Sequence, residues 1–373
     1  MADGDGIREQ WARARCLMEP RGIDALLVTE KYNYWLFTGH RSEQFDGRQR
    51  PMIMILPLRA EPCMIVYGRD EPQVRATAPV TNIRTYIDVP FPLELIPQAL
   101  RELGLSRANL GCEIGEFQRL GISYNDFLAV QRALPSMTIV DASAVFNHIR
   151  MVKAAWEVDR MRAACRMATE AWARTLARLE PGMDVARAQR IFEGEMLDTG
   201  GQLGHMEFGL EGHAFRHTYR RGDWLWCDFG LTYEGYRSDL ARMAVFGPPS
   251  DQQKREFAMI WELTHNLIKR IGPGVRCCDL ARQTSEDMVR LGLPPLDANK
   301  RVGHGFGVAS DPPSISLVDE TVLEPGMILT PEPRFMSASG QRIHIEEDVV
   351  VTESGGELLS RGAEVLSIIG AGR

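Results

Sequence analysis

The chain has 373 residues, of which 44% are hydrophobic and 25% charged, as in an ordinary globular protein long enough for two domains. Its net charge of -7 disfavours nucleic acid and anionic membrane as partners, because both bind basic surfaces. The sequence contains no run of about 18 apolar residues, so a membrane-spanning helix is not expected.

Cysteine usage and the N-terminal segment indicate the compartment. The seven cysteines are scattered, without the Cys-x-x-Cys or Cys/His spacing of a zinc site, which is typical of a reducing environment. The segment MADGDGIREQWARARCLMEPRG is charged throughout and lacks the apolar core of a signal peptide. We therefore expect a cytoplasmic protein.

Strand-like and helical segments alternate over the first 150 residues. A predicted helix ends near Pro20, and apolar runs typical of strands follow at 23–29, around Ile53 and at 63–67. Another strand is predicted at 109–115 and a helix at 125–134. This alternation predicts an α/β domain over residues 1–150.

From Glu157 onward, one arrangement of helices occurs twice. A long amphipathic helix reaches Leu179, the turn LEPG follows, and Asp184 is placed to cap a second helix through Leu197. About ninety residues later, WELTHNLIKRIGPG and VRCCDLARQTSEDMVRLG repeat the order of helix, Pro-Gly turn and helix. The repeat predicts a domain over 151–373 made of two halves related by a pseudo-twofold axis, with a site between them.

The segment 224–243, WLWCDFGLTYEGYRSDLARM, places one aspartate in each arm of an apolar hairpin. A reversal centred on Tyr233 and Glu234, beside Gly235, would place Asp228 directly opposite Asp239. Directly opposed residues point to the same face of a sheet, so the two carboxylates would converge. Such a pair needs shared protons, cationic partners or metal ions.

Three further candidate ligands follow the hairpin. His304 lies between glycines in GHGFG, Glu332 lies between two prolines, and Glu346 begins a strand-like run. Glu332 and Glu346 flank SASG at 337–340, a plausible reversal that would let them face one another. Four carboxylates and one imidazole suit a pair of divalent ions such as Mn, Co, Fe or Zn better than one structural zinc.

The motifs DFG, YRSDLAR, GHGFG, EPGMILTPEP and IEEDVVVTE, in this order, resemble those of the pita-bread metallopeptidase family M24, which includes aminopeptidase P, prolidase and creatinase. The resemblance implies an α+β fold, in which a pita-bread domain with pseudo-twofold halves follows a smaller α/β domain of the creatinase type. It also implies a homodimer. The positions that match the family's ligands to two metal ions are Asp228, Asp239, His304, Glu332 and Glu346.

The resemblance implies metal-dependent hydrolysis of a C-N bond in an Xaa-Pro-like dipeptide or in a small amide or amidine. Glu332 would accept a proton from water as general base, while His213 and His344 would orient the substrate and stabilise charge. One histidine is expected before the hairpin, and GLEGHAFRHTYRRGD offers His213, which we favour, and His217 as a substrate contact. Two alternatives stay open: a metal-dependent lyase acting on a small zwitterion, and a catalytically silent binding protein.

Two positions depart from the family pattern. Peptidases of the family carry a second histidine seven residues after the first, where this chain has Asp311. An ionised aspartate cannot donate a hydrogen bond to a developing oxyanion, so we expect Asp311 to bind substrate and to select a cationic or zwitterionic compound. Secondly, His344 replaces the usual arginine two residues before Glu346. Side chains two residues apart on a strand point to the same face, so His344 is predicted to point into the site.

Overall fold

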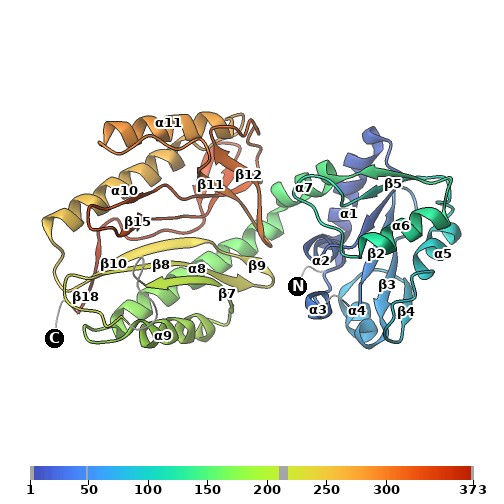
Figure 1. Cartoon of the computed structure of the whole chain (residues 1–373), viewed down its shortest axis with the longest axis horizontal. Helices are drawn as coiled ribbons and strands as arrows, with labels where there is room; N and C mark the ends of the chain where they lie inside the picture. The colour runs from blue at the N-terminus through green and yellow to red at the C-terminus, as the bar shows by residue number, and fades with distance from the viewer. Residues whose placement is uncertain (1–3, 48, 210–216, 371–373) are drawn as a thin grey trace. The chain divides into compact units, whose positions relative to one another are not determined.

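The computed structural model describes residues 4–47, 49–209 and 217–370 and consists of two compact units, Met1–Arg150 and Met151–Arg373 (Figure 1). Each unit has its own hydrophobic cores. In the described part of the chain, no helix combines the length and apolar character needed to cross a membrane.

The N-terminal unit is a mixed six-stranded sheet covered by helices on both faces. The sheet order is β4-β3-β2-β1-β5-β6, and both faces of its central strand β1 are buried, with Leu26 and Val28 in one core and Leu27 in the other. The strands are β1 Ala25–Val28, β2 Ile53–Pro57, β3 Cys63–Tyr67, β4 Asn82–Tyr86, β5 Asn109–Cys112 and β6 Thr138–Asp141. The helices are α1 Gly4–Met18, α2 Lys31–Thr38, α3 Gln44–Gly47, α4 Glu71–Thr77, α5 Leu95–Glu102, α6 Tyr124–Ala133 and α7 Ser143–Met151, with 3-10 turns at Glu19–Arg21 and Gly68–Asp70.

Sequence patterns predicted six of these thirteen helices and strands, namely α1, α6, β1, β2, β3 and β5, and α2 is among those that they missed. The segment KYNYWLFT has no polar face, because Asn33 through Thr38 are all buried, so it lacks the amphipathic pattern of a surface helix. Its start is nevertheless encoded locally: the Glu30 side chain accepts hydrogen bonds from the backbone amides of Tyr32 and Asn33.

The C-terminal unit contains the duplicated arrangement that the sequence predicts. The first half comprises α8 Ala155–Arg178, α9 Val185–Asp198, β7 Gln202–Gly209, β8 Trp224–Tyr233, β9 Tyr236–Arg237 and β10 Leu240–Phe246. The second comprises α10 Asp251–Arg270, α11 Cys277–Arg290, β11 Arg301–Phe306, β12 Ser310–Ser316, β13 Ile328–Pro331, β16 Val349–Thr352 and β17 Gly355–Leu358. The hairpin of β14 Arg334–Met336 and β15 Arg342–His344 lies within the second half, while β18 Ser367–Ile369 pairs with β10.

The duplication extends to individual residues. Asp184 caps α9 by accepting a hydrogen bond from the Arg187 amide, as the sequence predicts. Asp184 also forms an isolated β-bridge with Thr218, and the equivalent residue before α11, Arg276, forms one with Val322. Each half therefore attaches the start of its second helix to a following segment in the same way.

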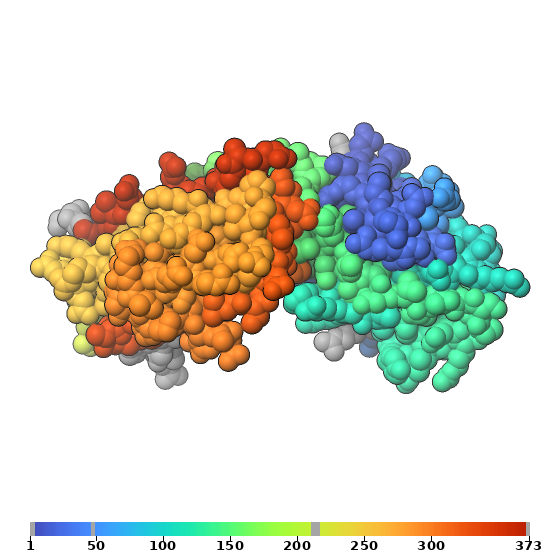
Figure 2. All heavy atoms as spheres, turned by 90° about the horizontal axis from the view of Figure 1, so that it is seen from above, coloured from blue at the N-terminus to red at the C-terminus, as the bar shows by residue number. Residues whose placement is uncertain are grey.

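The helix pairs cover the outside of the two sheets. Trp172 of α8 and Phe192 of α9 pack on Phe229 of β8, whereas Ile260 of α10 packs with Trp226 and Ile343 on the opposite side. Figure 1 shows α8 and α9 on one side of β8 and β10 and α10 on the other, and Figure 2 shows α10 and α11 in gold and orange on the unit's outer face. Polar residues of the strands are thereby left to meet between the halves.

Candidate metal centre

The hairpin register differs from the predicted one by two residues, because the turn is centred one residue later in the chain. Asp228 lies opposite Ala241, so the expected direct pairing of Asp228 with Asp239 is wrong. The reversal is centred on Glu234 and Gly235, whose φ angles of 44° and 92° form the left-handed two-residue turn that matches the twist of a hairpin. Asp239 instead lies diagonal to Asp228 on the same face, where the carboxylates still converge.

A backbone bridge joins this hairpin to the second half. Ala241 and Glu346 exchange amide-to-carbonyl hydrogen bonds of 3.4 and 3.2 Å. Ala241 therefore has Asp228 on one side and Glu346 on the other, and its small side chain leaves room between the two carboxylates. This bridge helps to bring the ligand candidates of the two halves together.

His304 and Glu332 reach the same place from the second sheet. The His304 Nδ1 atom lies 2.9 Å from the Gly305 carbonyl oxygen, which can only accept, so Nδ1-H donates and Nε2 is left to bind an ion. That Nε2 atom lies 3.6 Å from Asp239 Oδ2 and 3.9 Å from Glu332 Oε1. In the hairpin of β14 and β15, Arg334 lies opposite His344. The same register, extended by two residues along each strand, places Glu332 opposite Glu346.

All five residues of the predicted ligand set line one cavity of about 460 Å³. Donor atoms of four of them, all except Glu332, belong to overlapping groups within 4.8 Å, of which one contains Asp239, His304 and Glu346. Two further groups share these carboxylates with Asp228 and with the histidines 205 and 344. Shared carboxylates between imidazoles are a suitable donor set for more than one divalent ion. The cavity is lined by His205, Glu207, Asp228, Arg237, Asp239, Arg301, His304, Phe306, Ser310, Glu332, Arg334, Arg342 and Glu346.

Like charges are crowded together in the candidate centre. Burial, together with the neighbouring carboxylates of Asp239 and Asp228, raises the pKa of Glu346 well above its usual value. Burial lowers the pKa of His344 to about 3, so this imidazole is neutral, and neither ring nitrogen has a hydrogen-bond partner in the described part of the chain. His344 Nε2 lies 3.8 Å from Glu332 Oε2 and 3.9 Å from Glu346 Oε2. The side chain therefore points into the site, as its spacing from Glu346 along the strand predicts. Crowded carboxylates and an unpartnered imidazole fit bound cations.

The acidic residues next to Glu346 have structural partners instead. Glu347 pairs with Arg242 at 2.8 Å and accepts hydrogen bonds from Ser360 and the Gly362 amide. Asp348 accepts a 3.0 Å hydrogen bond from the backbone amide of Asp239. These contacts fix the chain on both sides of the centre.

His205 of β7 is a site residue that the sequence analysis missed. Its Nε2 atom lies 2.8 Å from Asp239 Oδ1 and 3.1 Å from Asp228 Oδ1. Burial alone would lower the pKa of His205, but its hydrogen bonds to the two aspartates outweigh burial and raise it to about 10. The sequence analysis expected a histidine closer to the hairpin, either His213 or His217. His213 lies outside the described residues. His217 contacts Asp223 at 2.8 Å and does not line the cavity.

Asp311 is buried in β12 and is not among the residues that line the cavity. Its Oδ2 atom and the Nζ atom of buried Lys153 approach the same glycine: a β-carbon on Gly307 would lie 3.5 Å from the former and 3.3 Å from the latter. The carboxylate is thus near a lysine of its own unit. Its assignment as a substrate contact stays a prediction.

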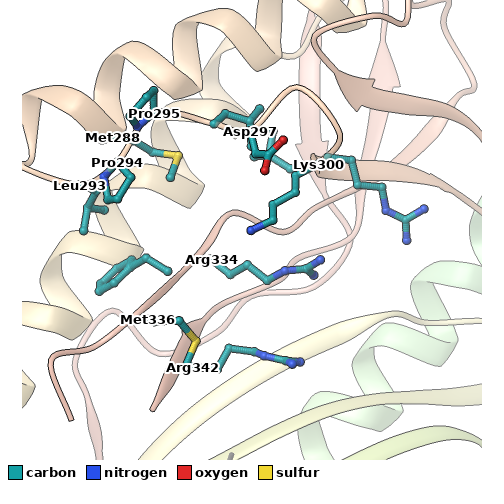
Figure 3. A pocket seen from close by; sticks show the side chains of 13 residues that line it. Met288, Leu293, Pro294, Pro295, Asp297, Lys300, Arg334, Met336 and Arg342 are labelled. Atoms are coloured by element: carbon teal, nitrogen blue, oxygen red, sulfur yellow. The ribbon is translucent and has the colours of Figure 1, made fainter. Parts of the chain in front are cut away.

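Arginines form the other side of the cavity. Arg334 Nη1 lies 2.6 Å and Arg301 Nε 3.1 Å from the Glu332 carboxylate, while Arg342 lies over the Trp226 ring at 4.7 Å. The same three arginines line a second, largely apolar cavity of about 410 Å³. Figure 3 shows Arg334 and Arg342 extending in the same direction. The apolar wall is formed by Met288, Leu293, Pro294, Pro295, Leu296, Val302, Phe335 and Met336.

Comparison with known families decides the class. The model of metallopeptidase family M24 matches residues 159–353, and that of the creatinase/prolidase N-terminal domain matches residues 10–152. The chain belongs to metallopeptidase family M24. A putative dipeptidase of Bacillus subtilis is 25% identical over 367 residues, covering 96% of this chain and 99% of the relative.

Solved structures of dipeptidases share the whole fold. The dipeptidase PepE from Mycobacterium ulcerans is 24% identical, with a TM-score of 0.84 and 99% of each chain covered. An Xaa-Pro dipeptidase from Bacillus anthracis is 21% identical, with a TM-score of 0.83, and covers 97% of this chain and 100% of its own. The predicted α+β fold, with a creatinase-type N-terminal domain before a pita-bread domain, is confirmed.

Proposed function

We propose that this M24 protein hydrolyses the peptide bond of a dipeptide that has a free carboxylate. The observation that supports the proposal is a single cavity with an acidic, imidazole-containing floor and an arginine rim. The full-length similarity to a putative dipeptidase supports the reaction class. Neither the lyase nor the silent binding protein has a comparable feature in its favour. The ions would be held by Asp228, Asp239, His304, Glu332 and Glu346.

The side chains divide the chemistry between them. Two bound divalent ions would lower the pKa of a water molecule and polarise the substrate carbonyl. Asp228, Asp239 and Glu346 would bind as carboxylates, so ion binding would displace the proton that burial and the neighbouring carboxylates favour on Glu346. Glu332 is the general base, since its carboxylate borders the cavity near His304 and His344. The neutral imidazole of His344 donates a hydrogen bond to the substrate.

The rim determines which end of the substrate is recognised. A guanidinium binds a carboxylate with two parallel hydrogen bonds, and Arg237, Arg301, Arg334 and Arg342 all line the cavity. Arg334 and Arg342 lie on one face of the β14-β15 hairpin and also border the apolar cavity. We therefore assign the substrate carboxylate to these two arginines and an apolar substrate side chain to the second cavity. This assignment replaces the preference for a cationic substrate, because Asp311 does not line the cavity.

Steady-state kinetics on a matched panel test the proposal. The panel pairs dipeptides, Xaa-Pro dipeptides included, with their C-terminal amides, and uses protein loaded with Mn, Co or Zn. We expect hydrolysis of the free dipeptides and, for Arg342→Ala, a KM for them raised about tenfold with little change for the amides. Arg282→Ala, an exposed arginine paired with Asp279, is the control. A metal-loaded protein that hydrolyses no dipeptide in the panel would overturn the proposal.

A further inference from the structure

A third imidazole faces the two aspartates of the hairpin. One atom, His205 Nε2, lies within 3.1 Å of an oxygen of Asp228 and 2.8 Å of an oxygen of Asp239. A bare nitrogen lone pair pointing at two carboxylates would be repelled by both of them. The place where these three atoms meet therefore needs a positive centre, either a proton or a cation.

The backbone is shaped to bring this ring to that place. The register of β7 with β8 shifts between Leu203 and Met206, an irregularity of the kind that redirects a side chain. A β-carbon on Gly230 would lie 2.7 Å from both Cε1 and Nδ1 of His205, so the ring occupies space that any other residue at position 230 would fill. In the hairpin register Gly230 lies opposite Asp239, which explains why the ring reaches that carboxylate.

We propose that His205 Nε2 is a ligand of the ion that Asp228 and Asp239 hold, so that each of the two ions has one imidazole, His205 for one and His304 for the other. The inference rests on the proposed function only in requiring bound ions. The two observed separations match neighbouring ligands on one ion with bonds of about 2.1 Å, which place cis donors roughly 3 Å apart. An imidazole ligand favours Co and Zn over Mn, which prefers oxygen donors.

A competing role for His205 makes the opposite prediction. If the ring only neutralises the two aspartates in the metal-free protein, it competes with the ion, and its removal should strengthen metal binding. If it is a ligand, its removal should weaken binding, and most strongly for metals that prefer nitrogen. The direction of the change in affinity therefore separates the two roles.

The experiment measures Co and Mn binding to wild-type protein and His205→Ala by calorimetry with elemental analysis, together with the visible absorption spectrum of the Co-loaded protein. In the variant, we expect one of the two Co sites to bind about 10- to 100-fold more weakly than in the wild type. The Mn affinity should change less, and the Co absorption bands should shift. Added imidazole should restore the wild-type spectrum. His265→Ala, which removes an imidazole stacked on Trp261 outside the cavity, is the matched control and should change nothing.

The outcomes separate this inference from the proposed function. Unchanged or stronger Co affinity in His205→Ala, with an unchanged spectrum, would overturn the ligand assignment while leaving a two-ion dipeptidase intact. A wild-type protein that binds no divalent ion would overturn both. Dipeptidase activity without the affinity change would contradict only the role of His205.

Discussion

The N-terminal unit and the metal centre each bury a glutamate, but in opposite surroundings. Glu113 is fully buried and accepts hydrogen bonds from the Thr29 amide and hydroxyl, the Glu30 amide and the Asn33 side chain, at 2.6 to 2.9 Å. It links β5 to the start of α2. Its own unit supplies donors to both of its oxygens.

Glu346 is equally buried, yet its neighbours are Asp228, Asp239 and Glu332, and the Thr330 hydroxyl is its donor. Burial of a carboxylate is therefore not itself a sign of function. A glutamate surrounded by donors organises a fold, whereas one surrounded by other carboxylates needs a proton or a cation.

The largest expected effect comes from removing a carboxylate of the metal centre. Asp239→Ala should remove bound metal and lower kcat/KM by about four orders of magnitude, about 5.5 kcal/mol. The metal-free variant should be as stable as the wild type or more stable, because one source of repulsion is gone. Elemental analysis, kinetics and urea unfolding measure the three quantities, with the exposed Asp251→Ala as control. Unchanged metal stoichiometry would refute the ligand assignment.

Removing Glu113, the buried acid of the N-terminal unit, should lower stability and leave metal binding unchanged. Glu113→Ala leaves the donors of Thr29, Glu30 and Asn33 without their acceptor, and we expect a loss of about 4 kcal/mol in the free energy of unfolding. Metal stoichiometry should not change, since the centre belongs to the other unit. Urea unfolding and elemental analysis test both statements. A Glu113→Ala variant that is as stable as the wild type but has altered metal content would contradict the structural role assigned to Glu113.

The pH dependence of stability should sharpen the comparison further. Burial raises the pKa of Glu113 to about 7 from its ordinary value of 4.5, although its hydrogen bonds act in the opposite direction. A raised folded pKa means that the folded state binds the proton more tightly, so the contribution is complete below pH 4.5 and is lost as pH rises toward 7.

We therefore expect the wild type to lose about 3 kcal/mol over this interval relative to Glu113→Gln, whose side chain does not titrate. Urea unfolding of both proteins between these pH values measures the difference. Parallel curves for the two proteins would show that Glu113 stays ionised throughout.

The sequence could predict those features that depend on residues close together in the chain. The five candidate ligands were predicted from short sequence motifs that resemble those of the family, and the structure brings all five to one cavity. The predicted hairpin register was wrong by two residues, because Gly235 takes the second central position of the turn, and the diagonal placement of Asp239 depends on that choice.

His205 was missed for a different reason. Its orientation depends on a register irregularity between β7 and β8 and on the absence of a side chain at Gly230, 25 residues later in the chain. The arginine rim was missed likewise, because Arg301 comes from β11 and Arg334 from the β14-β15 hairpin. The chemical environment of Asp311 depends on Lys153, which is distant in sequence. Contacts of this kind become visible only when the strands are assembled.

The smallest expected effect concerns two threonines that occupy equivalent roles. Thr29 donates to Glu113 at 2.6 Å, and Thr330 donates to Glu346. Replacing each by valine removes a hydroxyl with little change in shape. Thr29→Val should cost about 1 kcal/mol of unfolding free energy and leave metal affinity unchanged, because Glu113 serves only the fold. Thr330→Val should lower metal affinity about tenfold, because the hydroxyl orients a ligand carboxylate, while the unfolding free energy of the metal-free protein changes little. Calorimetric titration and urea unfolding of both variants give the two quantities side by side. Equal effects of the two substitutions on metal affinity would show that the chain does not separate its structural glutamate from its metal-binding one.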